Sequence, residues 1–141
     1  MAGDIVKCES CGTKNRVPIG GKGKAQCANC KKPLPWLVNA TDATIDQALD
    51  SKQLVLVDLW APWCGPCRMV APVLERMSKT YAGQVKVVKV NVDDSPRTSQ
   101  RFQASSIPTL VLWRDGKVVD RIIGAQPAPV LKQHVDAALA G

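Results

Sequence analysis

Two cysteines separated by two residues, Cys64 and Cys67, stand in the segment Trp63-Cys64-Gly65-Pro66-Cys67 of this 141-residue chain. The apolar run Leu54–Trp60 before them is typical of a buried strand, and a helical pattern starts near Cys64. Within one helical turn the two Cα atoms would lie ~5 Å apart, which suits a disulfide. The segment therefore predicts a dithiol that closes to a disulfide and reopens with little backbone movement.

The start of a helix distinguishes the two thiols. Its free backbone N–H groups and the positive end of its dipole stabilise a thiolate. We therefore expect Cys64 to be the attacking nucleophile, and Cys67, one turn further in and more buried, to be the resolving thiol. Pro66 suits the first helical turn, where its missing N–H would have no partner. The alternative is a zinc knuckle, which Pro66 disfavours because knuckles use such N–H groups to bind the first sulfur.

A different cysteine pattern occupies residues 1–35. The units Cys8-Glu9-Ser10-Cys11 and Cys27-Ala28-Asn29-Cys30 are separated by fifteen residues, the spacing of Cys₄ zinc sites. Large apolar residues are few here, so metal binding would supply the folding free energy. The pattern predicts structural Zn²⁺ held by Cys8, Cys11, Cys27 and Cys30, with a flexible hairpin tip at 20–24. Two disulfides are the alternative, which a reducing compartment disfavours.

Composition limits the class of protein and its compartment. No apolar stretch approaches the ~18 residues of a membrane span, and the first thirty residues contain seven charged residues and no apolar signal region. We expect a cytoplasmic protein without a membrane partner. The net charge is +7, of which +5 lies in residues 1–35. Four thiolates and Zn²⁺ would reduce that excess, so nucleic-acid binding is not predicted.

Residues 36–141 alternate between strand and helix patterns. Strands are predicted at 36–39, 54–60, 85–92, 109–113 and 117–123, with a hairpin turn at Asp115-Gly116. Helices are predicted after a cap at Thr41 or Asp42, at 64–81, at 95–103 and from Pro127. Pro72 should kink the second of them. The order predicts an α/β fold, with a mixed β-sheet between helices, as a domain of residues 36–141 that follows a zinc-binding domain at 1–35.

These residues resemble the thioredoxin family. The segment Trp60-Ala61-Pro62-Trp63-Cys64-Gly65-Pro66-Cys67-Arg68 is similar to its active-site signature, and the segment at 1–35 resembles the small zinc domain of the bacterial thioredoxin-2 type. Further matches in order and spacing are Asp58, Pro72, Lys89, Ile107-Pro108-Thr109, Asp115-Gly116 and Gly124. Pro62 occupies a position that varies in the family, and Trp113 stands where a smaller aromatic residue is often found; neither touches the expected mechanism.

The resemblance implies a protein-disulfide reductase. Cys64 would attack a disulfide in a target protein, Cys67 would resolve the mixed disulfide, and an NADPH-dependent thioredoxin reductase would restore the dithiol. Asp58 stands in a run that should be buried, which raises a carboxyl pKa and suits a proton acceptor for Cys67, through water. Lys89 is its candidate partner. The alternatives are a structural ion pair for Asp58 and a solvent-facing strand position for Lys89.

The resemblance also implies a surface that binds the target. A cis bond before Pro108 would place this proline beside the thiols and expose the backbone of Ile107 to an extended chain. Trp63, Gly65 and Pro66 would border this surface. Gly124 would allow close approach of the target; a strand terminator is its alternative, as a plain strand-start proline is for Pro108. His134 has no partner motif and is expected at the surface.

Three other functions remain open at this stage. The same fold could act as an oxidant or isomerase, although Gly65-Pro66 favours a reductase. The segment 1–35 could bind a nucleic acid or a protein, although it lacks the aromatic residues that stack on single strands. It could also be a redox sensor that releases zinc when its cysteines are oxidised.

Overall fold

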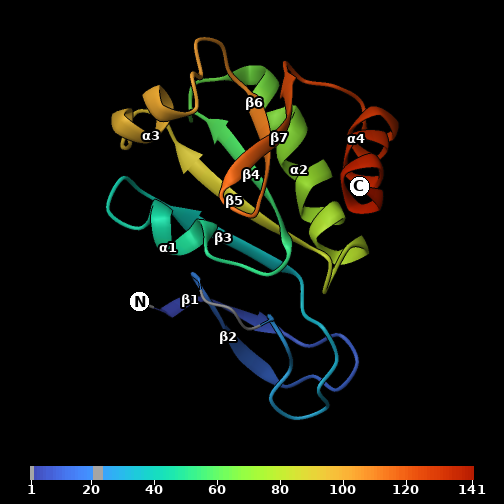
Figure 1. The fold of residues 1–141 in the computed structure, drawn as a ribbon. Helices are drawn as coiled ribbons and strands as arrows, with labels where there is room; N and C mark the ends of the chain where they lie inside the picture. Colours follow the sequence, from blue (N-terminus) through green and yellow to red (C-terminus); the bar gives the residue numbers. More distant parts are fainter. Residues whose placement is uncertain (1, 21–23) are drawn as a thin grey trace.

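The computed structural model describes residues 2–20 and 24–141, so the centre of the predicted hairpin tip lies outside the described residues. A five-stranded sheet with the order β3-β5-β4-β6-β7 forms the middle layer (Figure 1). Its strands are β3 (Trp36–Ala40), β4 (Leu54–Trp60), β5 (Val85–Asn91), β6 (Thr109–Arg114) and β7 (Lys117–Ile123). Strands β3, β5 and β4 are parallel to one another, whereas β6 is antiparallel to β4 and β7 is antiparallel to β6. The predicted mixed sheet is confirmed.

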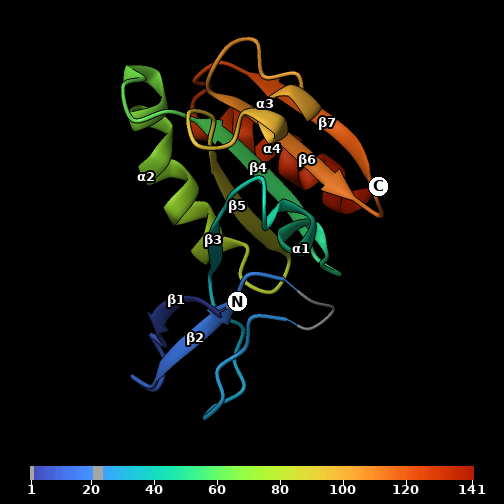
Figure 2. The ribbon, with the colours of Figure 1, turned by 90° about the vertical axis from the view of Figure 1, so that its left-hand side faces the viewer.

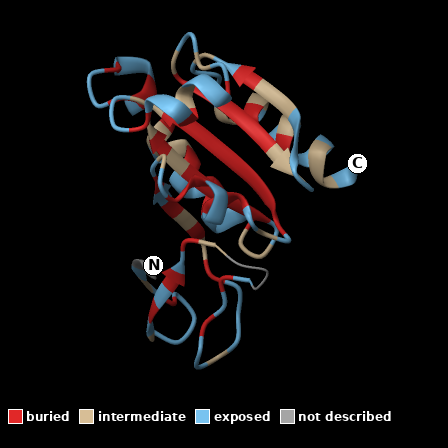
Figure 3. Ribbon diagram, turned by 60° about the vertical axis from the view of Figure 1, so that its left-hand side comes forward, coloured by how far each residue is buried: buried red, intermediate tan, exposed pale blue. Residues whose placement is uncertain are grey.

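Helices cover both faces of this sheet, as predicted. Short α1 (Ile45–Leu49) and α3 (Pro96–Arg101) pack on one face, and the longer α2 (Gly65–Thr80) and α4 (Ala128–Ala140) pack on the other (Figure 1). Strand β4 is buried along almost its whole length because β5 and β6 flank it and helices cover both of its faces (Figure 3). It is therefore a rigid support for whatever follows it in the chain.

Pro72 lies inside α2, and the apolar stripe predicted for this helix faces the sheet through Val70, Leu74 and Met77. The kink at Pro72 stays a prediction. Among the described residues, no helix combines the length and the apolar character that crossing a bilayer would need.

The cap predicted for α1 is wrong. The helix begins at Ile45 with Thr44 at its N-cap, and Asp42 instead accepts hydrogen bonds from the backbone N–H groups of Thr98, at 2.7 Å, and Arg97, at 3.2 Å. Asp42 therefore caps α3, which lies more than fifty residues further along the chain. A capping side chain chooses among N–H groups by proximity in space, and the sequence shows only proximity along the chain.

The N-terminal residues form a hairpin of β1 (Ala2–Lys7) and β2 (Lys14–Pro18) at one end of the sheet. Figures 1 and 2 both show this hairpin at the end opposite the start of α2. The hairpin and the following segment do not stand apart from the sheet, because Val17, Ile19 and Leu34 share one apolar cluster with Trp36 and Val38 of β3. The indole N–H of Trp36 also donates a 2.7 Å hydrogen bond to the carbonyl of Pro18.

A buried lysine joins this N-terminal unit to the sheet. Lys86 on β5 is fully buried, and its Nζ donates hydrogen bonds to the carbonyl oxygens of Ile19 and Ala48. Its ammonium also lies 4.3 Å from the centroid of the Trp36 ring. Burial lowers the pKa of Lys86 to about 8, against the attraction of Asp50. The folded protein therefore binds the Lys86 proton less tightly than the unfolded chain does.

We predict that the stability contribution of Lys86 depends on pH. The pKa of Lys86 in the folded state lies below its value of about 10.5 in the unfolded chain. The buried charge therefore lowers the free energy of unfolding below pH 8, and this loss disappears as the pH rises to 10.5. Relative to Lys86→Met, the wild-type free energy of unfolding should rise by about 2–3 kcal/mol across this interval. Denaturant unfolding at several pH values measures it. Lys117→Met, at an exposed strand position, should show no such trend, and a flat wild-type difference would refute the assignment.

Candidate functional site

Cys64 and Cys67 lie where the buried β4 gives way to α2. Cys64 is the N-cap of α2, its Sγ accepts a hydrogen bond from the backbone N–H of Cys67 at 3.2 Å, and the two residues are joined by a disulfide. Their Cα atoms are 5.3 Å apart, in agreement with the predicted separation. Both residues are only 4% exposed, so the expectation that Cys67 is the more buried is wrong for this disulfide form. What distinguishes the two sulfurs is the capping hydrogen bond that Cys64 receives.

The cis peptide bond at Ile107–Pro108 is present beside this pair. The carbonyl oxygen of Ile107 lies 3.8 Å from the Sγ of Cys64, and Ile107 packs against the cysteines together with Ala61 and Val92. The carbonyl of Pro108 accepts a hydrogen bond from Gly124 N–H at 2.9 Å. Gly124 has φ of +88°, and a Cβ there would meet Gln126 Nε2 at an ordinary 3.9 Å, so the positive φ is what requires glycine. The loop before β6 and the end of β7 thus meet at the sulfurs.

Trp63 is the exposed neighbour of the disulfide. Its side chain is 68% exposed, and its indole N–H donates to Asp93 Oδ2 at 2.9 Å. Gly65 leaves open space beside the first turn of α2. The sequence analysis did not identify Asp93, because thirty residues separate it from Trp63 and no local motif connects the two.

Asp58 is buried on the α2 face of β4, as predicted. It is 2% exposed, and burial raises its pKa to about 6, against the attraction of Lys89. Lys89 is the partner of Asp58 in the parallel pairing of β4 with β5, and its Nζ lies 5.0 Å from the centroid of the Trp60 ring. The carboxyl atom Oδ1 of Asp58 is buried without a hydrogen-bond partner among the described residues. Asp58 is therefore a proton-binding group whose charge is poorly compensated.

We predict that Asp58→Asn stabilises the fold above pH 6. Because the folded pKa of Asp58 lies above its value of about 3.8 in the unfolded chain, ionisation destabilises the folded state progressively from pH 4 upward. The variant should gain about 2–3 kcal/mol in free energy of unfolding at pH 8 and little at pH 4. Denaturant unfolding across this range measures it, with Asp115→Asn at the exposed hairpin as the control. An equal gain at both pH values would contradict a buried ionising carboxyl.

Four further cysteines form a second cluster, in the N-terminal unit. The Sγ atoms of Cys8, Cys11, Cys27 and Cys30 all lie within 4.8 Å of one another. Cys8 and Cys30 approach to 3.6 Å, as do Cys11 and Cys27. A tetrahedral zinc site with Zn–S bonds of about 2.3 Å has sulfurs ~3.8 Å apart, so these residues fit such an ion.

The surroundings favour the thiolate at Cys11 and Cys27 but not at Cys30. Against a backbone hydrogen bond from Lys32, burial and the neighbouring cysteines raise the pKa of Cys30 to about 11. The hydroxyl and backbone of Thr13 lower the pKa of Cys11 to about 5, and a backbone hydrogen bond from Cys30 leads the causes that lower the pKa of Cys27. Asn15 supports the cluster from behind, since its Nδ2 donates to Cys27 Sγ at 3.5 Å and its Oδ1 accepts from Ala28 N–H at 2.9 Å. Thiolates are the form that a metal binds.

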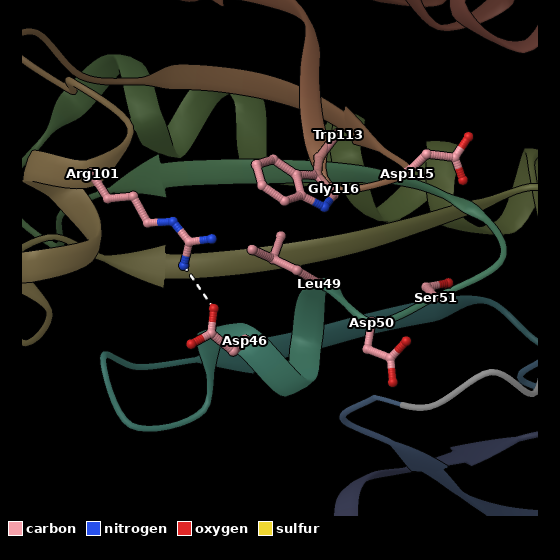
Figure 4. A pocket seen from close by; sticks show the side chains of 8 residues that line it. All are labelled: Asp46, Leu49, Asp50, Ser51, Arg101, Trp113, Asp115 and Gly116. Carbon is pink, nitrogen blue, oxygen red and sulfur yellow. Dashed lines mark hydrogen bonds and ion pairs between the residues drawn. The ribbon is translucent and has the colours of Figure 1, made fainter.

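Two hollows on the surface differ in their relation to the sulfurs. One of about 710 Å³ is lined by Val92, which packs against the cysteine pair, and by uncharged residues from 96 to 105. The other, of about 360 Å³, lies between α1, α3 and the β6–β7 hairpin (Figure 4). There Arg101 forms a 2.8 Å ion pair with Asp46, and the lining contains no cysteine. The first hollow likewise has no cysteine in its lining, and it meets the redox centre through Val92.

The expectation for His134 is wrong in part. Its Nδ1 lies 2.6 Å from Oδ2 of Asp120, and both side chains are about one third exposed. The packing of α4 against β7 creates this pair, which no spacing in the sequence indicates. It lies among the pocket residues Arg114 and Ala138, away from the cysteines.

Comparison with known proteins identifies similar chains. The family model described as Thioredoxin matches residues 36–137. The protein "Thioredoxin 1" of Synechococcus elongatus is 52% identical over 97 residues, covering 68% of this chain and 91% of that protein. "Thioredoxin" of Alicyclobacillus acidocaldarius is 49% identical over 100 residues, covering 71% and 91%, and that of Staphylococcus aureus is 44% identical over 103 residues, covering 70% and 98%.

Proposed function

The chain belongs to the thioredoxin family of thiol–disulfide oxidoreductases, and from this premise we propose that it reduces disulfides in target proteins through a mixed disulfide on Cys64. The observation that carries the proposal is the hydrogen bond from Cys67 N–H to Cys64 Sγ at the start of α2. A donor aimed at sulfur stabilises the thiolate, which is both the attacking form and the better leaving group.

The proposed reaction has two exchange steps. In the first, the Cys64 thiolate attacks one sulfur of the target disulfide, the target S–S bond breaks, and the other target sulfur leaves as a thiolate. In the second, Asp58 accepts the proton of Cys67 through water, and the Cys67 thiolate attacks Cys64. The Cys64–Cys67 bond forms, the mixed disulfide breaks, and the target has gained two electrons. An NADPH-dependent thioredoxin reductase would return two electrons and restore the dithiol.

We propose that the target chain lies along Ile107. The Ile107 carbonyl is 3.8 Å from Cys64 Sγ, so a strand paired to this backbone would carry its disulfide to the nucleophile. Trp63, Gly65 and Pro66 would border the target on one side, and Pro108 and Gly124 on the other. The uncharged hollow beside Val92 would accept a target side chain.

We predict that Cys67→Ser accumulates a covalent adduct with a disulfide-containing target such as insulin. Without the resolving thiol the mixed disulfide on Cys64 persists, so the adduct should survive non-reducing electrophoresis and disappear with dithiothreitol. Cys64→Ser is the matched control: it should form no adduct and lose essentially all insulin-reducing turbidity. Equal activity of Cys64→Ser and wild type would remove the proposed nucleophile.

Equilibration with glutathione separates reductase from oxidant. A reductase should have a reduction potential near the family value of about −270 mV, whereas a strong disulfide donor has one near about −120 mV, and the second result would contradict the reductase. The reducing direction also agrees with the compartment that we propose, the cytoplasm, where thiol clusters remain reduced.

For the second cluster we propose structural Zn²⁺ held by Cys8, Cys11, Cys27 and Cys30. Bound there, the ion would cross-link the two cysteine-bearing turns, which otherwise contribute few apolar side chains. Four protein ligands close the coordination shell, so the role is stability of the N-terminal unit. The N-terminal unit lies at the end of the sheet opposite the start of α2 (Figures 1 and 2). The proposed zinc would therefore not cover the Cys64–Cys67 pair.

We predict one zinc ion and two reactive thiols per reduced chain. Metal analysis with a thiol count measures both, and the remaining four sulfurs should react only after the metal is removed. Cys27→Ser should lose about one zinc per chain, whereas Cys64→Ser combined with Cys67→Ser should retain it. Six reactive thiols and no metal in freshly reduced protein would exclude the site.

A further inference from the structure

Two residues of β4 present unmatched polar atoms to the same face. Asp58 and Trp60 are two positions apart in one strand, so their side chains point the same way from Cα atoms about 7 Å apart. Among the described residues, neither Oδ1 of Asp58 nor Nε1 of Trp60 has a hydrogen-bond partner, and both atoms are buried. One is an acceptor and the other can only donate.

The two atoms complement each other. A buried polar atom without a partner is destabilising, and buried waters typically satisfy such atoms in pairs or triples. The indole of Trp60 is also held in place, since it packs against the Cys64–Cys67 cluster and lies 5.0 Å from the ammonium of Lys89. The indole therefore lies against the cysteine cluster and beside Lys89, the residue paired with Asp58 on β5.

We propose that Trp60 is a positioning residue for Asp58, and that its indole N–H donates to one water molecule that in turn donates to the Asp58 carboxylate. This rests on the proposed function only in assigning Asp58 as the proton acceptor of Cys67. The indole would hold the carboxylate and its water in line with the resolving thiol, while its ring orients Lys89.

This hydrogen bond opposes the effect of burial. Burial raises the pKa of Asp58 to about 6, and donors to the carboxylate favour its charged form. The neighbouring strands contribute Lys89 from β5 and the apolar Leu110 from β6, and α2 contributes the Cys67 sulfur. Of the ionisable groups of α4, His134 pairs with Asp120, Asp136 accepts from Tyr81, and Lys132 is exposed. Loss of the indole donor should therefore raise the Asp58 pKa further.

The first test uses wild-type protein in its disulfide form, where neither Cys64 nor Cys67 titrates. Nuclear magnetic resonance follows the indole N–H of Trp60 and the carboxyl carbon of Asp58 from pH 4 to pH 9. Both signals should inflect at the same pH, and the indole inflection should vanish in Asp58→Asn. The indole of Trp36, which is bonded to Pro18, serves as the internal control. A Trp60 indole chemical shift that does not change as Asp58 titrates overturns the proposal.

The second test removes the donor and keeps an aromatic ring. In Trp60→Phe the Asp58 pKa should rise by about one unit, and the pH profile of mixed-disulfide resolution should shift upward equally. In an Asp58→Asn background the same substitution should leave the profile unchanged. Trp113→Phe, which alters an indole on the opposite face of the sheet, should shift neither quantity. Equal shifts with and without Asp58 would overturn the proposal.

The outcomes separate this inference from the proposed function. If Asp58→Asn leaves the pH profile of resolution unchanged while the Trp60 signal still tracks Asp58, the contact stands and the acceptor role of Asp58 falls. If adduct trapping succeeds and the Trp60 signal is independent of Asp58, the reductase stands and the positioning role falls. Should Trp60→Phe fail to fold, the wild-type titration alone decides.

Discussion

The chemistry of this protein depends on a hydrogen bond that exists because a helix starts where a buried strand ends. Cys67 N–H can reach Cys64 Sγ only while Cys64 occupies the N-cap of α2, and β4 fixes that position by its pairing with β5 and β6. An N-cap donor has no helical carbonyl to bind, so it is free to stabilise sulfur charge. Helices on both faces of the sheet hold β4 in place, and this fixes the position of the two sulfurs that follow it in the chain.

Two buried charges show how a structural ion differs from a functional one. Lys86 has no exposure, and its ammonium bonds to two carbonyls and lies over Trp36, so its hydrogen bonds are made although burial lowers its pKa to about 8. Asp58 is as deeply buried, its Oδ1 has no partner among the described residues, and its pKa is raised to about 6. A buried carboxyl without a full set of hydrogen bonds lowers the stability of the fold. The same burial raises the proton affinity of the group toward neutral pH. Such local conflict is expected where function, not folding, selected the residue.

The sequence was informative where structure depends on neighbours along the chain. The apolar run of β4 and the Asp115-Gly116 turn, with φ of +53° and +80°, carry local signals, and both were predicted correctly. The C-x-x-C spacings bring sulfurs together, in the Cys64–Cys67 disulfide and in the cluster of four, while zinc there stays a proposal. The missed features join distant residues. Asp42 caps α3, Asp93 binds Trp63, and Asp120 pairs with His134, each across a fold whose packing no local pattern encodes. The alternation of side chains along β5 likewise does not predict that Lys86 is fully buried, because the Ile19 carbonyl that its Nζ bonds lies 67 residues earlier in the chain.

The six sulfurs divide because their backbones differ, although both kinds use the same C-x-x-C spacing. At Cys64 the pair opens a helix sixteen residues long, so the Cys67 N–H donates to Cys64 Sγ and the two sulfurs bond to each other. At Cys8 and Cys27 the pairs lie in tight turns from separate parts of the chain, and their sulfurs converge on a common point. The two centres then lie at opposite ends of the sheet, and β5 is the strand that contacts both regions. Its Lys86 binds the N-terminal unit, and its Lys89 stands beside Asp58, with the two side chains on opposite faces. An influence of the metal unit on the redox pair would act through this strand or through α2, which begins at the redox pair and whose Lys79 pairs with Glu9 at 3.5 Å.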